Sequence, residues 1–134
     1  MSPTEPDPDC VFCEELALGN TVAELGHAVA LRDRFPVTEG HTLVIPRFHV
    51  ADLFDLPDEA VGDIWRLLKS LREQLNRDDP TIRGYNLGVN SGVVAGQTVP
   101  HAHVHLIPRR KGDTPEPRGG VRGVIPGQMS YAPR

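Results

Sequence analysis

Residues 101–107 of this 134-residue chain read His-Ala-His-Val-His-Leu-Ile, so that histidines alternate with apolar residues until Pro108. In a β-strand, successive side chains point to opposite faces. The alternation therefore predicts a strand with three imidazoles on one face and with Ala102, Val104 and Leu106 in a core. Imidazoles are costly to bury without partners, but they suit nucleophilic, acid–base or metal chemistry near neutral pH. Because three of the six histidines fall within five residues, we expect a functional site here rather than a half-exposed strand.

The length and composition of the chain fit one compact domain. Hydrophobic residues make up 39% of the sequence, enough for a small core that a metal or a dimer interface would help to stabilise. The formal net charge of −4 argues against a general nucleic-acid-binding protein. A basic stretch follows the histidines, and it either attracts a phosphorylated small molecule or forms a solvated tail: Arg109, Arg110, Lys111, Arg118 and Arg122.

The sequence also bears on location and redox state. Residues 1–9 lack the cationic and apolar regions of a signal peptide, and no apolar run approaches membrane-spanning length. We therefore expect a cytoplasmic protein with no membrane partner, in which thiols stay reduced. In that setting the close pair Cys10 and Cys13 favours metal or redox chemistry over a structural disulfide.

Three segments are expected along the chain. A disordered leader covers 1–9, a domain covers 10–111, and a Pro/Gly-rich tail over 112–134 packs on the domain or on a dimer partner. Within the domain, the patterns predict helices over 14–18 and 57–77 and strands over 21–25, 27–32, 41–45, 85–89 and 101–107. Strands in hairpin order beside segregated helices favour an α+β fold with an antiparallel sheet. One apolar stripe on the long helix is interpreted as core, with Trp65 beside it: Val61, Ile64, Leu68, Leu71 and Leu75.

Three sequence blocks together resemble the histidine-triad (HIT) superfamily, whose motif is His-φ-His-φ-His-φ-φ with φ apolar. The first is Ala-Gly-Gln-Thr-Val-Pro-His-Ala-His-Val-His-Leu-Ile-Pro-Arg over 95–109. The others are Gly-His-Thr-Leu-Val-Ile-Pro over 40–46 and Cys-Val-Phe-Cys over 10–13. The resemblance covers roughly residues 10–110. It implies a HIT-like antiparallel sheet of about five strands with one long and one short helix, and a homodimer.

The same resemblance assigns chemistry to the triad. It implies that the middle histidine, His103, attacks an α-phosphorus, while the backbone carbonyl of His101 sets the tautomer of the His103 ring. His105 would contact the phosphoryl oxygens. Gln97 and Thr98 offer an amide and a hydroxyl for the phosphate and the leaving group. The alternative is that these two side chains satisfy backbone groups of their loop.

Further residues match nucleotide-binding positions of the family. Asp33 stands where HIT proteins place an Asp or Asn that hydrogen-bonds the ribose hydroxyls. The alternative is an Asp held between Arg32 and Arg34 in a charged turn. Asn90 is placed to reach the nucleotide, and His41 corresponds to a histidine that, in the metal-free branch, shares a hydrogen-bond network with the first triad histidine.

A zinc site is also implied. One branch of HIT proteins binds structural zinc through a Cys-x-x-Cys pair, a histidine after the Gly-His-Thr strand and the first triad histidine. All four positions carry matching residues here: Cys10, Cys13, His49 and His101. Zinc bound to His101 would hold the His101 carbonyl in place and so orient His103, rather than act as a Lewis acid. A metal-free thiol pair is the alternative.

The function expected from this resemblance is a nucleotide hydrolase. It would release a nucleoside monophosphate through a covalent nucleotidyl-histidine, acting on purine dinucleoside polyphosphates, phosphoramidates or adenylates. The Gly-Gln-Thr-Val-Pro-His lead-in is similar to the fragile-histidine-triad type, and the Cys-x-x-Cys start to the histidine-triad nucleotide-binding type. A phosphorylase or transferase on the same fold and a nucleotide-binding module with little turnover are alternatives. A purely structural zinc domain would leave His103 and His105 without roles.

Overall fold

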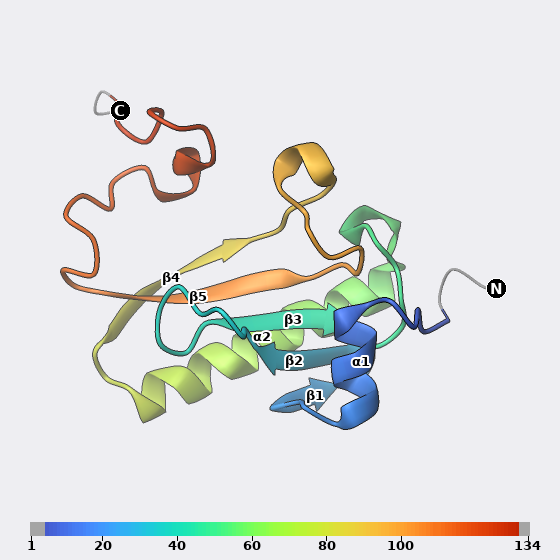
Figure 1. Cartoon of the computed structure of the whole chain (residues 1–134). Helices are drawn as coiled ribbons and strands as arrows, with labels where there is room; N and C mark the ends of the chain where they lie inside the picture. The colour runs from blue at the N-terminus through green and yellow to red at the C-terminus, as the bar shows by residue number, and fades with distance from the viewer. Residues whose placement is uncertain (1–4, 132–134) are drawn as a thin grey trace.

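The computed structural model of the protein describes residues 5–131. Within these residues, one sheet holds five antiparallel strands in the order β1-β2-β3-β5-β4. Their bounds are β1 (Ala23–Leu25), β2 (Ala28–Arg32), β3 (Thr42–Pro46), β4 (Ile82–Gly88) and β5 (Val104–Arg110). The short helix α1 (Val11–Leu18) lies over β2 and β3, and the long helix α2 (Asp58–Asp78) lies behind the sheet (Figure 1). The structure confirms the expected α+β fold.

Helix α2 forms where the apolar stripe predicts it, one residue later at each end than expected. Asp58 and Glu59 occupy its first turn, where negative charge favours the positive end of the helix dipole. Four residues of the predicted stripe are buried, but Val61 is a correction because it lies on the exposed side with Trp65. In the same turn Ala60 faces the core and is fully buried, whereas Val61 lies beside the groove that Trp65 lines.

The core has two layers, one on each face of the sheet. On the α2 side, small and branched strand residues pack against helix residues that include Ile64 and Leu71. The strand residues include Ala28, Ala30, Val44, Val104 and Leu106. The α1 side is smaller and combines Cys10, Phe12, Cys13, Val29, Leu31, Leu43 and Ile45. Strand residues therefore alternate between the two layers, as the period of a β-strand requires.

The triad segment corrects one expectation. Strand β5 begins at Val104, so His101 to His103 precede it. The pairing of β3 with β5 covers only Thr42 to Val44 on the β3 side. Before that, the N–H of Ala102 donates to the carbonyl of Val50 over 2.7 Å, which ties the chain to the segment after β3. The alternation persists, because Ala102 still joins the α2-side core.

His27, to which the sequence interpretation assigned no role, is paired with Asp63. Its Nδ1 lies 2.9 Å from Oδ2 of Asp63 on α2, and its backbone N–H donates to the same oxygen. That backbone hydrogen bond, with help from Arg66, holds the pKa of Asp63 well below its usual range. The pair links the turn between β1 and β2 to the long helix.

Both flanking segments contact the domain. The N–H of Asp7, within the expected leader, lies 3.5 Å from Sγ of Cys13. In the tail, the 3₁₀ turn η3 (Gly120–Val124) packs against β4. Residues 1–4 of the leader and 132–134 of the tail lie outside the described residues. Among residues 5–131, neither helix combines the length and the apolar character needed to cross a bilayer.

Candidate active site and metal centre

A cavity of about 320 Å³ opens on the α1 face of the sheet. Five of the site residues predicted from sequence line it: Asp33, Asn90, Thr98, His103 and His105. Much of the remaining wall is apolar and comes from α1, β2, β3 and the loop before β5: Val11, Phe12, Leu31, Leu43 and Val99. A largely apolar cavity with a few convergent polar groups is typical of a site for a small organic ligand.

The His103 ring is held by the chain just before it. Its Nδ1–H donates to the backbone carbonyl of His101 over 2.8 Å. A carbonyl oxygen only accepts, so the neutral ring carries its proton on Nδ1 and a lone pair on Nε2. Phe12 packs edge-to-face on the ring with the centroids 5.1 Å apart. Among the described residues Nε2 has no hydrogen-bond partner, which leaves a nucleophilic nitrogen for a ligand in the cavity.

His41 and His105 form a hydrogen-bonded pair beside that nitrogen. The N–H of Val37 donates to Nδ1 of His41 over 3.1 Å, so the His41 proton is on Nε2. Nε2–H then donates to Nδ1 of His105 over 2.9 Å, which leaves His105 with its own proton on Nε2. Burial lowers the pKa of both rings from the ordinary value of 6.5. The pair is therefore neutral near pH 7, and His105 offers an N–H to a ligand.

Asp33 lies beside this histidine pair and lines the cavity. Its Oδ1 accepts the N–H of Phe35 over 2.8 Å, and its Oδ2 lies 3.5 Å from Nε2 of His41. The neighbouring arginines bind elsewhere, since Arg32 donates to Thr42 and Arg34 donates to Glu15. The charged-turn alternative for Asp33 therefore lacks its expected partners. Oδ2 remains able to accept from a ligand hydroxyl in the cavity.

Gln97 and Thr98 differ in position. The Gln97 amide donates to the carbonyls of Ala51 and Val99, and its oxygen accepts the N–H of Gly92. Gln97 thus satisfies backbone groups, as in the alternative considered for this loop. Thr98, by contrast, lines the cavity. Sequence spacing does not separate two neighbouring polar residues of one loop.

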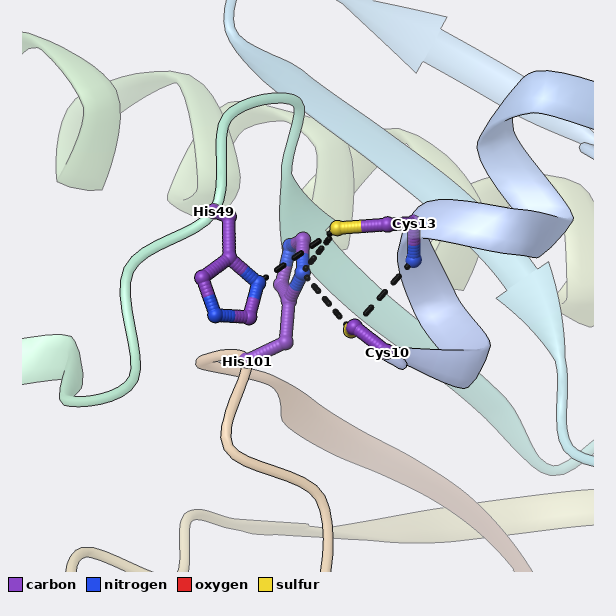
Figure 2. Close-up of side chains that lie close together, drawn as sticks. All are labelled: Cys10, Cys13, His49 and His101. Carbon is purple, nitrogen blue, oxygen red and sulfur yellow. Dashed lines mark hydrogen bonds between the residues drawn. The ribbon is translucent and has the colours of Figure 1, made fainter. Parts of the chain in front are cut away.

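The four predicted metal ligands converge behind the triad. Figure 2 shows Cys10 and Cys13 at the start of α1 facing His49 and His101, and all four donor atoms lie within 4.8 Å of one another. Nδ1 of His101 is 3.5 Å from Sγ of Cys10 and 3.6 Å from Sγ of Cys13. Nδ1 of His49 is 3.4 Å from Sγ of Cys13.

These distances match a tetrahedral metal site. Zn–S and Zn–N bonds of about 2.3 and 2.0 Å at a tetrahedral angle place sulfur and nitrogen about 3.5 Å apart. The tautomer of His101 also fits, because Nε2–H donates to the carbonyl of Pro46 over 2.9 Å and leaves a lone pair on Nδ1. Burial lowers the pKa of His101 to about 4 and raises the pKa of Cys10. The donor set is the one that zinc prefers.

Phe12 and Glu15 are among the residues at these sites that the sequence interpretation missed. Phe12 touches the rings of both His101 and His103, and Glu15 lines the cavity. Both lie on α1, which begins at Val11 and is capped by the side chain of Cys10 rather than starting at Glu14 as expected. The signal was present, because residues 11, 12 and 15 share one helix face once the helix is started at Cys10.

The fold and the site define a class, an α+β domain with an imidazole-lined ligand cavity in front of a Cys₂His₂ cluster. The family profile of the HIT domain matches residues 17–112. The chain therefore belongs to the HIT family. It is 36% identical over 112 residues to the adenosine 5'-monophosphoramidase HNT1 of Saccharomyces cerevisiae, covering 81% of this chain and 68% of that protein.

Solved structures agree with this assignment. A HIT family protein from Bacillus anthracis superposes with a TM-score of 0.73 at 37% identity, covering 79% of this chain and 77% of that one. A Zn-bound histidine triad family protein from Mycobacterium smegmatis also gives a TM-score of 0.73, at 34% identity and with 81% and 80% of the two chains covered.

Proposed function

We propose that the protein is a nucleotide hydrolase that cleaves at the α-phosphate through a nucleotidyl-His103 intermediate. The observation that carries this proposal is the 2.8 Å hydrogen bond from Nδ1 of His103 to the carbonyl of His101, which leaves Nε2 unprotonated at the cavity. The amidase names of relatives in Saccharomyces cerevisiae and Candida albicans support hydrolysis of a nucleoside phosphoramidate. Purine dinucleoside polyphosphates and adenylates share the same α-phosphate.

Two displacements at phosphorus complete the reaction. Nε2 of His103 forms a P–N bond as the bond to the leaving group breaks. The leaving group departs with the bonding electron pair, and the amine of a phosphoramidate also takes up a proton from solvent. Water then attacks the same phosphorus and releases a proton to solvent, the P–N bond breaks, and the electron pair returns to Nε2. The Nε2–H of His105 and the hydroxyl of Thr98 would donate to phosphate oxygens, where negative charge develops. The His101 carbonyl keeps the His103 ring in one tautomer throughout.

The remaining wall of the cavity would hold the nucleoside. Oδ2 of Asp33 would accept from the ribose hydroxyls, and Asn90 would reach the sugar or the phosphate. His41 would act indirectly as a positioning residue, because it fixes the tautomer of His105. Gln97 would position the loop that carries Thr98 rather than touch the substrate.

We further propose that Cys10, Cys13, His49 and His101 hold one zinc ion. The matched tetrahedral distances support this, and so does the Zn-bound relative from Mycobacterium smegmatis. Bound zinc would act as a structural brace for α1 and for the His101 backbone.

A homodimer completes the proposal. Strand β4 is an edge strand of the sheet. Between β4 and α2 lies an apolar groove of about 290 Å³, lined by Val61, Trp65, Leu87 and Val89 among others. These four side chains are exposed in the single chain. An exposed apolar patch beside an unpaired strand edge is typical of a protein interface, and a second copy would cover both.

A substrate panel in ¹⁸O-water tests the hydrolase proposal. Adenosine phosphoramidate, diadenosine triphosphate and diadenosine tetraphosphate are each incubated with the protein, with and without inorganic phosphate, and the products are identified by mass spectrometry. We expect a nucleoside monophosphate that carries one ¹⁸O. A nucleoside diphosphate formed only with phosphate would indicate a phosphorylase. One burst of product without turnover would indicate a nucleotide-binding module.

A further inference from the structure

A carboxylate lines the cavity beside several apolar side chains. Glu15 on α1 lies there together with Val11, Phe12, Leu31 and Leu43. Only 14% of the Glu15 side chain is exposed. Its acceptor oxygens are therefore placed where a ligand in the cavity can reach them.

The protein supplies a hydrogen-bond donor to only one of the two carboxylate oxygens. Arg34, which lines the same cavity, donates to Oε1 of Glu15, while 62% of its own side chain stays exposed. Among the described residues Oε2 accepts no hydrogen bond. An ionised carboxylate has about four acceptor positions on its two oxygens. A ligand in the cavity therefore meets a fixed anionic acceptor with unused lone pairs.

Glu15 is too far along α1 to belong to the metal cluster, whose ligands on this helix are Cys10 and Cys13. It also precedes residues 17–112, which match the HIT family profile. The apolar side chains around it could pack on an aromatic ring, and Asp33 and His103 line the same cavity. Glu15 thus lies where the base of a bound nucleotide would be held.

We propose that Glu15 reads the base and makes the site selective for guanine nucleotides. This inference rests on the proposed nucleotide site. Guanine presents two neighbouring N–H donors, N1–H and N2–H, which match the two oxygens of one carboxylate. Adenine places one donor beside the acceptor N1, whose lone pair faces a carboxylate unfavourably. Hypoxanthine keeps N1–H but lacks the N2 amino group, and cytosine pairs its amino donor with an acceptor.

The experiment measures binding of GMP, IMP and AMP to the zinc-loaded full-length protein by calorimetry. The wild type should bind GMP about tenfold or more tightly than AMP, with IMP between them. In Glu15→Gln, the amide replaces one acceptor with a donor, so it should lose affinity for GMP and gain it for AMP. The GMP/AMP preference should fall by about tenfold or more. The matched control is Glu14→Gln, an exposed neighbour on the same helix, which should keep the wild-type preference.

Three results would overturn the inference: equal wild-type affinities for GMP and AMP, an unchanged preference in Glu15→Gln, or no binding of any of the three nucleotides. Thermal melting of each variant shows whether it is folded, and the GMP/AMP ratio within one variant is independent of its active fraction. Binding does not require turnover. A Glu15-dependent preference without hydrolysis would therefore refute the hydrolase and keep the base selectivity, and hydrolysis without any base preference would do the reverse.

Discussion

His101 serves two neighbouring sites through two different groups. Its backbone carbonyl accepts Nδ1–H of His103 over 2.8 Å, while its own Nδ1 faces Sγ of Cys10 at 3.5 Å. The imidazole is fully buried and is fixed from its other side by the carbonyl of Pro46. The cysteine cluster and the His103 ring are therefore linked through the same backbone segment.

Removing one cysteine should test the metal cluster. The purified wild type should contain about one zinc per chain, and Cys10→Ser should lose most of it. Because metal binding stabilises a small fold directly, its melting temperature should fall by about 10 °C or more. Metal content by plasma emission and melting by circular dichroism give both values. His27→Asn, a histidine paired with Asp63 outside the cluster, should keep its zinc. Equal zinc content in Cys10→Ser and wild type would refute the assignment.

Asp33 should read the ribose. Asp33→Ala is expected to weaken binding of a ribonucleoside monophosphate by about 1–3 kcal/mol, the scale of a lost hydrogen bond to a charged group. The loss should be smaller for the 2′-deoxynucleotide, which already lacks one donor hydroxyl. Calorimetry with both ligands measures the difference, and Asp55→Ala, an exposed residue outside the cavity, is the control. Equal losses for the two ligands would mean that Asp33 only supports its turn.

The buried histidine pair should make stability depend on pH. Burial lowers the pKa of His41 and His105. Within residues 5–131, the charged or titratable groups that act on this pair are the carboxylate of Asp33 and the imidazole of His103. As pH falls below about 6.5, the unfolded chain takes up protons on these residues before the folded chain does. The free energy of unfolding should therefore decrease between about pH 7 and pH 5. His41→Asn removes one such group and relieves His105 of a neighbour, so its slope should be shallower. Urea unfolding followed by circular dichroism decides this, and parallel slopes would contradict it.

Charge placed in the apolar groove should separate the proposed dimer. Light scattering should give the wild type twice the chain mass of 14.7 kDa. Leu87→Glu places a carboxylate on the groove side of β4 and should give a monomer, because burying an unpaired charge at an interface is costly. Phe54→Glu alters an equally apolar residue that does not line the groove, and should remain dimeric. A monomeric wild type would remove the basis of this proposal.

Sequence periodicity predicted the long helix to within one residue and the existence of all five strands, because both depend on alternating or 3.6-residue apolar patterns that tertiary contacts reinforce. It placed two strand starts three residues off, since β4 begins at Ile82 rather than at 85 and β5 at Val104 rather than at 101. It was less successful at the start of α1, where Cys10 acts as the helix cap in place of the usual Ser, Thr, Asp or Asn. Because the start of the helix was placed at Glu14, Phe12 and Glu15 were not included in the predicted site.

The side-chain partners were harder to foresee than the site itself. The cavity is lined by residues of α1 together with Leu31 and Leu43 on separate strands. No local sequence pattern predicts that these residues lie side by side. In the same way, Gln97 and Thr98 are adjacent in sequence, yet one fastens the loop and the other faces the cavity. By contrast, the resemblance to a family motif was enough to predict that Cys10, Cys13, His49 and His101 lie together, as they do in the structure.

The most direct test of the account is to trap the covalent intermediate. A nucleoside phosphoramidate is mixed with excess protein, quenched within one turnover in alkaline denaturant, digested and analysed by mass spectrometry. We expect one nucleotidyl group on His103, appearing before the nucleoside monophosphate and decaying as that product forms. His103→Ala should show no adduct and should lose activity by orders of magnitude, as enzymes do when a nucleophile is removed. An adduct on another residue, or more than a few per cent of wild-type activity in His103→Ala, would contradict the assignment of His103 as the nucleophile.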